Sequence, residues 1–504
     1  MGGATDANLY AQLRARFPRD AGAPFLETPE GRVVRYADVE ADTSRLARRL
    51  RALGAKRGDR VAAQVEKSPE AVLLYLACVR AGLVFLPLNP AYRDAEVGFF
   101  LADAEPAVVV RDPARGEAVP QGGAAHATLA ADGSGSLTDG LAAEPADDAI
   151  ARAAPHEPAA ILYTSGTTGR AKGAVLSHEN LASNARALHR AWGFRPDDVL
   201  LHALPVFHAH GLFVALHTSL WNGTGLLFLP RFEVDAVLAA LPRATVMMGV
   251  PTYYTRLLAD PRFDRARAGH VRLFVSGSAP LLAETFERFR ARTGHAILER
   301  YGMTETGMNT SNPLDGERVA GSVGPALPGV ELRVCDEAGG VLGANEVGAL
   351  EVRGPNVFRG YWRLPEKTAS EFRAGGWFAT GDLARIDARG YVHLVGRAKD
   401  LVITGGLNVH PKEVEEVLDA HPDVLESAVF GTPDPDFGEA VTAAVVPAAG
   451  ASMLDERALL AFARERLAGF KLPKRIVVLA ELPRNAMGKV QKAELRARYT
   501  RAEP

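Results

Sequence analysis

Cysteine is scarce in this sequence, and neither sign of charge dominates it. Only Cys78 and Cys335 occur among 504 residues, and they stand in unrelated contexts. Two isolated thiols provide neither a disulfide framework nor a cysteine metal site, which favours a reducing, cytoplasmic location. Lysine and arginine total 58 against 60 aspartate and glutamate residues, a net charge of −2. This balance predicts no nucleic-acid partner.

Long hydrophobic runs are also missing. The most apolar stretch, residues 71–88, contains Arg80 and Pro87, and we expect it to form a buried helix and strand. The first 17 residues contain no apolar segment of the kind found in secretory signals. We therefore expect no membrane partner. The sequence leaves the choice between monomer and dimer open.

The length and composition are typical of a soluble enzyme with more than one domain. Hydrophobic residues make up 47% and charged residues 23% of the chain. A chain of 504 residues is too long for one hydrophobic core, so a large domain divided into lobes and a smaller domain are expected.

The N-terminal third alternates between helical and strand periodicity. Helices are predicted over residues 36–53 and 69–80, and strands over residues 59–65 and 83–88. This alternation indicates an α/β fold with a parallel sheet. Residues 112–150 are rich in glycine, alanine and aspartate and are interpreted as a surface excursion.

The rest of the chain divides near residues 396–400. From residue 159 the order is strand, glycine-rich loop and helix, followed by further α/β units, and residues 321–353 predict a small lobe resembling a β-barrel. A compact α+β pattern follows the charged turn at Arg397. Its helices are predicted over residues 411–420 and 454–467, and its strands over residues 425–431 and 441–446.

Residues 163–173, YTSGTTGRAKG, have the chemistry of a phosphate-binding loop. Three glycines let the backbone bend closely around an anion, while four hydroxyl side chains and a lysine provide hydrogen-bond donors. The spacing is not that of a Walker A loop. Composition alone also allows a solvated turn. The candidate ATP ligands here are Thr164, Ser165, Gly166, Thr167, Thr168, Gly169 and Lys172.

This loop resembles the phosphate loop of the adenylate-forming superfamily, which includes acyl-CoA synthetases, adenylation domains and beetle luciferases. Further motifs occur in that family's order, and the resemblance spans residues 25–500. It implies that ATP activates a carboxylic acid as an acyl-adenylate, with Mg²⁺ bound to the ATP phosphates. Coenzyme A then accepts the acyl group.

Two further motifs match the family's nucleotide site. Ser276–Pro280 (SGSAP) and the segment ERYGMTET, residues 299–306, follow predicted strands. The resemblance implies that Tyr301 stacks on adenine and that Glu305 binds Mg²⁺ with the Thr168 hydroxyl. Without the resemblance, Tyr301 would be interpreted as a core residue and Glu305 as a residue that caps a turn. The remaining nucleotide ligands that the resemblance implies are Gly277, Ser278, Ala279, Glu299, Arg300, Gly302 and Thr304.

The resemblance also assigns residues near the domain boundary. Asp382 matches the carboxylate that accepts the ribose hydroxyls, and Arg397 adds a ribose or phosphate contact. Lys489, in the terminal motif PRNAMGK, would stabilise charge on the α-phosphate. The implied catalytic set is Lys489, His208, Thr168 and Glu305.

The same resemblance implies two domains that move relative to each other. Residues 1–396 would form the adenylation domain and residues 397–504 a mobile domain that turns about Lys399 after adenylation. Gly405 and Gly406 would then line a tunnel for the pantetheine arm of coenzyme A, because glycine permits close approach.

Three polar residues indicate the acid. His208 and His210 would share one face if their segment is extended. They also allow a zinc interpretation, although no third ligand is nearby. Arg256, in VPTYYTR, stands where relatives with hydrophobic substrates carry apolar residues, and its guanidinium suits a carboxylate. A surface pair with Asp260 is the alternative.

Within the superfamily, the strings GVPTYYTRLL, SGSAPLLA and ERYGMTETGMNTSNP resemble the malonyl-CoA synthetase subfamily. The resemblance implies that Arg256 and Ser278 hold the distal carboxylate near His210, and that Ala209 and Met308 bound the space around the α-carbon. The subfamily often has threonine at the position of Ala209, which leaves methylmalonate open as a second acid.

Three alternative functions remain at this stage. The first is an acyl-CoA synthetase for another short-chain or aryl acid, which predicts an exposed Arg256. The second is a carrier-protein ligase, although no carrier domain follows in the sequence. The third is a non-catalytic nucleotide-binding protein, against which Lys489, Glu305 and Asp382 argue.

Overall fold

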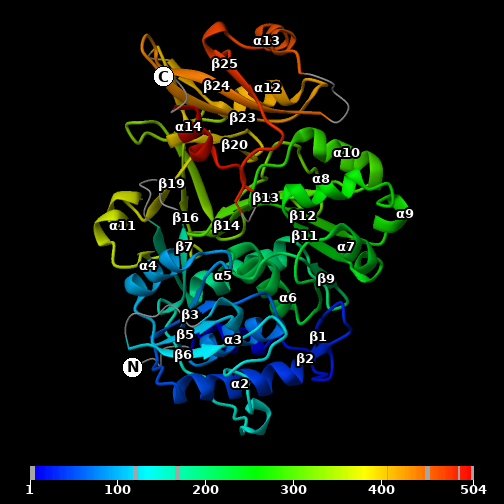
Figure 1. Cartoon of the computed structure of the whole chain (residues 1–504), viewed down its shortest axis with the longest axis vertical. Helices are drawn as coiled ribbons and strands as arrows, with labels where there is room; N and C mark the ends of the chain where they lie inside the picture. The colour runs from blue at the N-terminus through cyan, green and yellow to red at the C-terminus, as the bar shows by residue number, and fades with distance from the viewer. Residues whose placement is uncertain are drawn as a thin grey trace.

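The chain is organised around β-sheets arranged along its long axis. The computed structural model describes residues 6–116, 123–164, 171–405, 407–448, 454–485 and 488–500, and in these residues the strands form four sheets. The N-terminal sheets occupy one end and the C-terminal sheet the other (Figure 1). None of the helices in these ranges is long and apolar enough to span a bilayer.

The first sheet is mostly parallel, as the alternating pattern predicts. Short, fully buried runs such as Val108–Arg111 pack on both faces, which is typical of parallel strands covered by helices. Its seven strands lie in the order β17 (Gly360–Tyr361), β8 (Lys172–Ser177), β7 (Pro158–Thr164), β4 (Val84–Pro87), β3 (Arg60–Gln64), β5 (Val108–Arg111) and β6 (Ala125–Thr128).

The predicted surface excursion, residues 112–150, is partly wrong. It contains β6, which pairs with β5 in parallel, and its Leu129 and Leu137 are fully buried. Arg80 is also fully buried and donates to the carbonyl oxygens of Asp147 and Ala149 at 2.6 and 3.1 Å. The glycine-rich composition therefore did not predict that part of this segment is buried and that Arg80 holds its end by hydrogen bonds.

The second sheet has parallel strands in its middle and an antiparallel strand at each edge. The carboxyl ends of its central strands therefore meet at one side, where ligands of α/β sheets bind. Its eight strands lie in the order β14 (Gly307–Ser311), β13 (Leu298–Met303), β12 (Leu273–Ser276), β11 (Val246–Gly249), β9 (Val199–His202), β10 (Gly225–Phe228), β1 (Pro24–Glu27) and β2 (Val33–Arg35).

Helices pack between and outside these two sheets. Every residue of Pro69–Arg80 is buried, so this helix lies inside the main core. The helices of this region are α1 (Leu9–Arg14), α2 (Tyr36–Ala52), α3 (Pro69–Arg80), α4 (Asp94–Ala104), α5 (His178–Ala191), α6 (Leu216–Asn222), α7 (Val234–Ala240), α8 (Pro251–Ala259), α9 (Arg265–Ala268), α10 (Ala283–Thr293) and α11 (Pro365–Glu371).

The segment around the predicted phosphate loop differs from the expected strand, loop and helix. Residues 172–177 form β8, which returns antiparallel to β7, and α5 begins only after β8. Most of the run from Lys172 to Ser177 is buried, and the Ser177 hydroxyl caps the first turn of α5. The two strands that flank the predicted loop therefore pair with each other.

The third sheet is the strand-rich lobe that the sequence predicts, and it extends beyond residue 353 to Arg397. Its core contains Tyr301, Leu350 and Val392. The strands lie in the order β15 (Glu331–Cys335), β16 (Gly348–Arg353), β19 (Trp377–Ile386) and β18 (Phe372–Arg373), and β20 (Val392–Arg397) pairs with β19.

The fourth sheet has its own hydrophobic core, which includes Val429, Val441 and Leu459. Its strands are β22 (Leu407–Val409), β21 (Val402–Thr404), β24 (Gly438–Pro447), β23 (Val424–Asp434) and β25 (Arg475–Val478), and its helices are α12 (Pro411–Asp419), α13 (Glu456–Arg464) and α14 (Lys492–Thr500). The segment between β25 and α14 descends toward α8 and β13 (Figure 1).

Candidate active site

The turn of the β7–β8 hairpin carries the predicted phosphate ligands. Five of them, Ser165, Gly166, Thr167, Thr168 and Gly169, lie outside the described residues. The two that flank them are described, and Thr164 pairs with Lys172 across the hairpin. The two predicted ligands that the structure places, Thr164 and Lys172, are therefore the last residue of β7 and the first residue of β8.

Lys172 belongs to a chain of polar contacts that reaches Glu305. The Lys172 ammonium lies 3.3 Å from a Glu371 carboxylate oxygen and 4.3 Å from the centre of the Tyr361 ring. The Tyr361 hydroxyl lies 2.7 Å from Glu371 and 3.0 Å from Glu305. Sequence reasoning missed Tyr361 and Glu371, because each stands in an ordinary helix or strand pattern.

Glu305 is a buried carboxylate without a cationic partner among the described residues. Its residue is 6% exposed, and burial raises the pKa of its carboxyl group, which the Tyr361 hydrogen bond partly offsets. A buried anion is unfavourable unless a cation or several donors compensate it. This carboxylate therefore fits the hard cation that the sequence predicts there.

The three predicted adenosine residues meet at the junction of the third sheet with β13. Asp382 accepts a hydrogen bond from the Tyr301 hydroxyl, and it pairs with the Arg397 guanidinium at 2.7 Å. Burial raises the pKa of Tyr301, and the neighbouring Asp382 charge adds to this shift. The structure therefore brings these residues together as the sequence predicts.

Lys489 lies close to this cluster, although it comes from the far end of the chain. Burial lowers its pKa to about 8, and the Arg397 charge adds to this shift. The lysine is carried by a tight hairpin in which Arg484 bridges to Val490, and the Lys489 backbone N–H donates to the Asn485 side chain at 3.0 Å.

The Lys489 hairpin also meets α8. A side-chain carbon placed on Gly488 would lie 3.2 Å from the Thr252 hydroxyl oxygen. The fourth sheet, which supports the hairpin, is thus joined at this point to the second sheet, which supports α8.

The SGSAP turn follows β12 and contacts His210. Ser278 has a φ of 72°, a conformation that costs a residue with a side chain about 1–3 kcal/mol and that clusters at functional sites. Its hydroxyl lies 3.1 Å from His210 Nδ1, while the buried Nε2 of His210 has no hydrogen-bond partner in the described structure. The His210–Ser278 pair therefore leaves one buried nitrogen, His210 Nε2, without a hydrogen bond in the described structure.

Arg300 lies directly under this turn and is 3% exposed. A Cβ atom on Gly277 would lie 2.5 Å from the Arg300 Cζ, so the glycine backbone rests on the guanidinium. Within the described residues its buried Nε and Nη2 atoms have no partner, and it forms no ion pair. Burial lowers the pKa of Arg300 to about 9.

The two histidines do not lie on an extended strand, so the condition under which they would share one face is not met. Ala209 is helical, with φ −50° and ψ −40°, and a π-helix spans His210–Ala215. His208 Nδ1 accepts the backbone N–H of His210 at 3.2 Å. Burial lowers the pKa of His208 to about 4, and the charge of Arg300 acts in the same direction. Nothing in the described ranges forms a metal-binding group of three His, Cys, Asp or Glu residues around them.

Arg256 is exposed, and it forms no hydrogen bond or ion pair with the described residues. The alternative pairing is also absent, because Asp260 binds Arg262 at 2.6 Å. Arg256 lies one helical turn after Thr252, so both side chains share the face of α8 that meets the Lys489 hairpin. The structure places this cation at the rim of the site.

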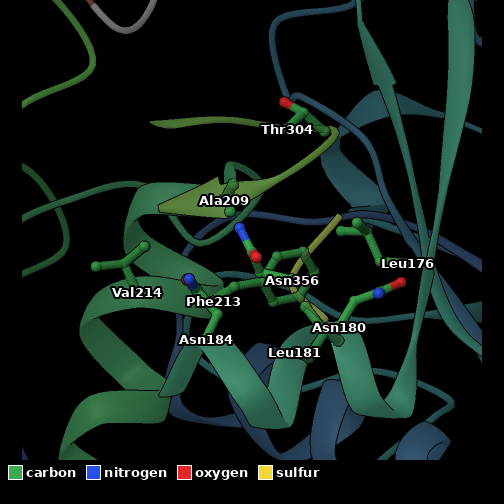
Figure 2. A pocket seen from close by; sticks show the side chains of 10 residues that line it. Leu176, Asn180, Leu181, Asn184, Ala209, Phe213, Val214, Thr304 and Asn356 are labelled. Carbon is green, nitrogen blue, oxygen red and sulfur yellow. The ribbon is translucent and has the colours of Figure 1, made fainter. Parts of the chain in front are cut away.

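A small cavity, about 10 Å³ in volume, lies between α5, the π-helix and the β13–β14 hairpin. That space holds about one water molecule. Figure 2 shows Ala209 and Thr304 on one side and Asn180, Leu181 and Asn184 on the other. Met308 is fixed nearby, because its backbone N–H and C=O both bond to the Asn184 side chain.

The other predicted ligands are placed with fewer contacts. Glu299 accepts the Leu281 N–H at 3.0 Å, and burial raises its pKa to about 7. Ala279, Gly302 and Thr304 are half-buried around the same turn and hairpin. These positions are compatible with a nucleotide site.

The predicted hinge and tunnel residues lie at the edge of the fourth sheet. Lys399 is in a short turn, Ala398–Asp400, between β20 and β21. Gly405 is exposed, has a φ of 57°, and donates its N–H to the Phe437 carbonyl at 2.8 Å. Gly406 lies outside the described residues. The roles predicted for Lys399 and Gly405 require a second arrangement of the domains.

Comparison with known proteins supports the same organisation. The AMP-binding enzyme family matches residues 13–362, and the AMP-binding enzyme C-terminal domain matches residues 413–489. The chain is 55% identical to ATP-bound MatB from Rhodopseudomonas palustris, with a TM-score of 0.95 and 99% of each chain covered. With apo MatB from the same organism the TM-score is 0.84 at 54% identity, again with 99% of each chain covered.

Two curated relatives extend the comparison. The chain is 39% identical to a feruloyl-CoA synthase of Amycolatopsis sp, covering 93% of this chain and 94% of that protein. It is 43% identical to the mitochondrial malonate–CoA ligase of Mus musculus over 67% of this chain. That match spans 64% of the mouse protein, less than two thirds of its length. The whole-chain agreement with MatB confirms the predicted α/β fold with a small C-terminal α+β domain.

We expect Gly277→Ala to destabilise the protein by about 1–3 kcal/mol, because the new methyl group overlaps the buried Arg300 guanidinium. Denaturant unfolding measures this loss. Gly98→Ala is the control: Gly98 lies in α4, and a methyl group added there meets open space, with no neighbour within 4 Å beyond its own helix. The control should be neutral or slightly stabilising. Equal stability of Gly277→Ala and the wild type would contradict the packing described.

Proposed function

Because this chain belongs to the family of AMP-binding enzymes, we propose that it is an AMP-forming malonate–CoA ligase. One malonate carboxylate oxygen attacks the α-phosphorus of ATP, and the bond to the β-phosphate breaks to release pyrophosphate. The coenzyme A sulfur then attacks the acyl carbon of malonyl-AMP, and AMP leaves as the C–O bond breaks. The observation that carries the choice of acid is the buried Arg300 cation beside His210 and Ser278.

The nucleotide half of the site follows from the Tyr301, Asp382 and Arg397 cluster. Asp382 has the acceptor oxygens that a ribose diol requires, and Arg397 holds it at 2.7 Å. Tyr301 offers a flat ring beside it. We assign adenosine to this cluster and the phosphates to residues 164–172.

Magnesium is the cation that we assign to Glu305. The site fits, because a buried carboxylate without a cationic partner in the described structure needs one, and hard oxygen ligands suit Mg²⁺. Thr168 is the second proposed ligand and lies outside the described residues. When bound, the ion would neutralise charge on the ATP phosphates.

Lys489 is the proposed electrostatic catalyst of the first half-reaction. Its ammonium would face the charge that develops on the α-phosphate as pyrophosphate leaves, and no proton transfer is required of it. His208, beside the histidine turn, is proposed to border the reacting carboxylate. The higher TM-score with ATP-bound MatB than with apo MatB supports an arrangement in which Lys489 is already close to the nucleotide.

The distal carboxylate is assigned to the pocket under the SGSAP turn. Arg300 provides a buried positive charge with two unused N–H groups, and the His210–Ser278 pair provides further polar atoms. A charged carboxylate would compensate the guanidinium, whereas an apolar acyl group would leave it unpaired. Arg256, at the rim, is proposed as a second, weaker contact.

The exposure of Arg256 also favours a second candidate function, a ligase for another short-chain or aryl acid. That alternative does not account for the buried Arg300 charge. Coenzyme A is the proposed acceptor in either case. We infer that residues 397–504 turn about Lys399 so that Gly405 and Gly406 approach the pantetheine arm.

An acid panel tests the choice of substrate. We expect AMP formation with coenzyme A present to be fastest with malonate, because only a dicarboxylate pairs with Arg300. Arg300→Met should lower kcat/KM for malonate about 30- to 5,000-fold and spare acetate, since truncating one partner of a buried, hydrogen-bonded charge pair costs about 2–5 kcal/mol. Arg256→Met should cost less, and Arg262→Met, which removes an exposed arginine paired with Asp260, is the control.

Two outcomes of this panel would contradict the proposal. If acetate or benzoate outperforms malonate, the Arg300 assignment is wrong and the second candidate gains. If no acid releases AMP, the enzyme assignment itself fails.

A second prediction concerns the space beside Ala209. Ala209→Thr adds two heavy atoms to the wall of a cavity that holds about one water. We expect kcat/KM for methylmalonate to fall about 10- to 200-fold, the usual value of one methyl group in a tight pocket, while malonate changes less than the methylated acid. Competition assays with both acids measure the ratio, and malonate is the internal control. An unchanged ratio would place the α-carbon elsewhere.

A third prediction concerns pH. Burial lowers the pKa of Lys489 to about 8 in the nucleotide-free protein, and the protonated amine is the proposed active form. The kcat/KM for ATP should therefore fall as the pH rises through about 8, because this ratio reports the free enzyme. Lys489→Arg should move that limb to higher pH. A limb that stays in place in this variant would assign it to another group.

A further inference from the structure

Lys67 lies between the two large sheets, outside every residue that the sequence assigns to the site. It follows β3 of the first sheet, and its side chain crosses to the carboxyl ends of β9 and β10 in the second. Its Nζ lies 2.9 Å from His202 Nδ1, 2.8 Å from the His202 carbonyl oxygen and 2.6 Å from the Leu229 carbonyl oxygen. The Phe228 ring centre is 4.3 Å away.

These acceptors match the donors of an ammonium group one for one. Lys67 forms no ion pair in the described structure, and burial lowers its pKa. The Gly211 carbonyl oxygen, 2.9 Å from His202 Nε2, can only accept a hydrogen bond, so the neutral ring donates from Nε2 and His202 Nδ1 accepts from Lys67. Burial lowers the pKa of His202 to about 3, and the Lys67 charge acts in the same direction, which keeps the ring neutral.

The tautomer of His202 has a structural consequence in the acid pocket. Its Nε2–H is directed at the Gly211 carbonyl oxygen, 2.9 Å away. Gly211 sits in the first turn of the π-helix, where a side chain would overlap the Pro205 carbonyl oxygen. The residue before it is His210, whose Nδ1 lies 3.1 Å from the Ser278 hydroxyl. π-Helical turns are rare and occur frequently at functional sites.

We propose that Lys67 is a positioning residue for the acid pocket. It holds the ring of His202 in its place, and this ring holds the Gly211 backbone and so places His210 against Ser278. This inference rests on the proposed function for the identity of the acid, although not for the contacts themselves. Lys67 also joins the two sheets through its bonds to His202 and Leu229.

The test compares the effect of each substitution on KM for malonate with its effect on KM for ATP. Lys67→Met removes the ammonium and keeps a long side chain, so His202 Nδ1 loses the donor that holds the ring in its place. We expect KM for malonate to rise about 10-fold or more, while KM for ATP stays within about two-fold. Lys56→Met, which removes an exposed lysine from the same lobe, is the control and should change neither.

Substitutions of His202 separate positioning from simple support of the fold. His202→Gln retains an acceptor and a donor in one side chain and should keep KM for malonate within about three-fold of wild type. His202→Phe keeps the ring packing against Phe228 and loses both bonds, so it should reproduce the Lys67→Met effect. The wild-type assay is read first: if malonate is not a substrate there, the proposed function fails, and the variants are compared with whichever acid releases AMP.

Three results would overturn the inference. The first is an unchanged KM for the acid in Lys67→Met. The second is an equal rise of both KM values with a lowered melting temperature, which would indicate a structural role only. The third is a His202→Gln variant as impaired as His202→Phe.

Discussion

The guanidinium of Arg300, buried beneath the backbone of Gly277 without a carboxylate partner among the described residues, is the constraint on which the site depends. Removing a charge from water is unfavourable by several kcal/mol unless a partner compensates it, so a folded protein retains such a group where a ligand supplies the partner. Glycine at position 277 lets the backbone rest on this cation, and Ser278 follows it in a left-handed conformation. Burial lowers the pKa values of His208 and His210, and the Arg300 charge acts in the same direction. Glu305 is the opposite case, a buried anion whose proposed partner is a metal ion.

These two uncompensated charges lie in β13 and in the segment that joins β13 to β14, and the C-terminal hairpin meets the neighbouring Asp382 and Arg397 cluster. Lys489 reaches the Asp382 and Arg397 cluster because its tight turn is held by Asn485 and because Gly488 leaves room for Thr252. A side chain at position 488 would need a left-handed φ of 73° and would press against α8. The fit of this loop therefore depends on the orientation of the fourth sheet relative to the second. A proposed rotation about Lys399 would withdraw the charge without unfolding either sheet, because each has its own core.

Periodicity and motif together predict the helices and strands well, since segments such as residues 69–80 are governed by local pattern and end at strong signals. Two kinds of feature were not predicted from the sequence. The histidine segment looks extended in sequence, yet the neighbouring Gly211 packs on Pro205 and the chain turns into a π-helix. The sequence assigns Arg300 to the nucleotide because its motif belongs to the nucleotide site. The structure places the Arg300 guanidinium under the SGSAP turn, beside the histidines. Lys67, Tyr361 and Glu371 had no local signal at all, because their partners are more than one hundred residues away or lie across a loop.

Burial distinguishes the roles of the two cations proposed for the acid. Arg256, exposed at the rim on α8, acts through solvent, where charges are screened and chiefly affect the rate of encounter. Arg300 acts in a region from which water is largely excluded, where a charge pair is strong and an unpaired charge is costly. In the proposed function, recognition of a second carboxylate therefore depends mainly on Arg300, and the exposed Arg256 contributes less. Since a pocket built around a buried cation penalises an apolar acid by leaving that cation unpaired, selectivity against monocarboxylates follows from the fold of the SGSAP turn itself and needs no steric barrier.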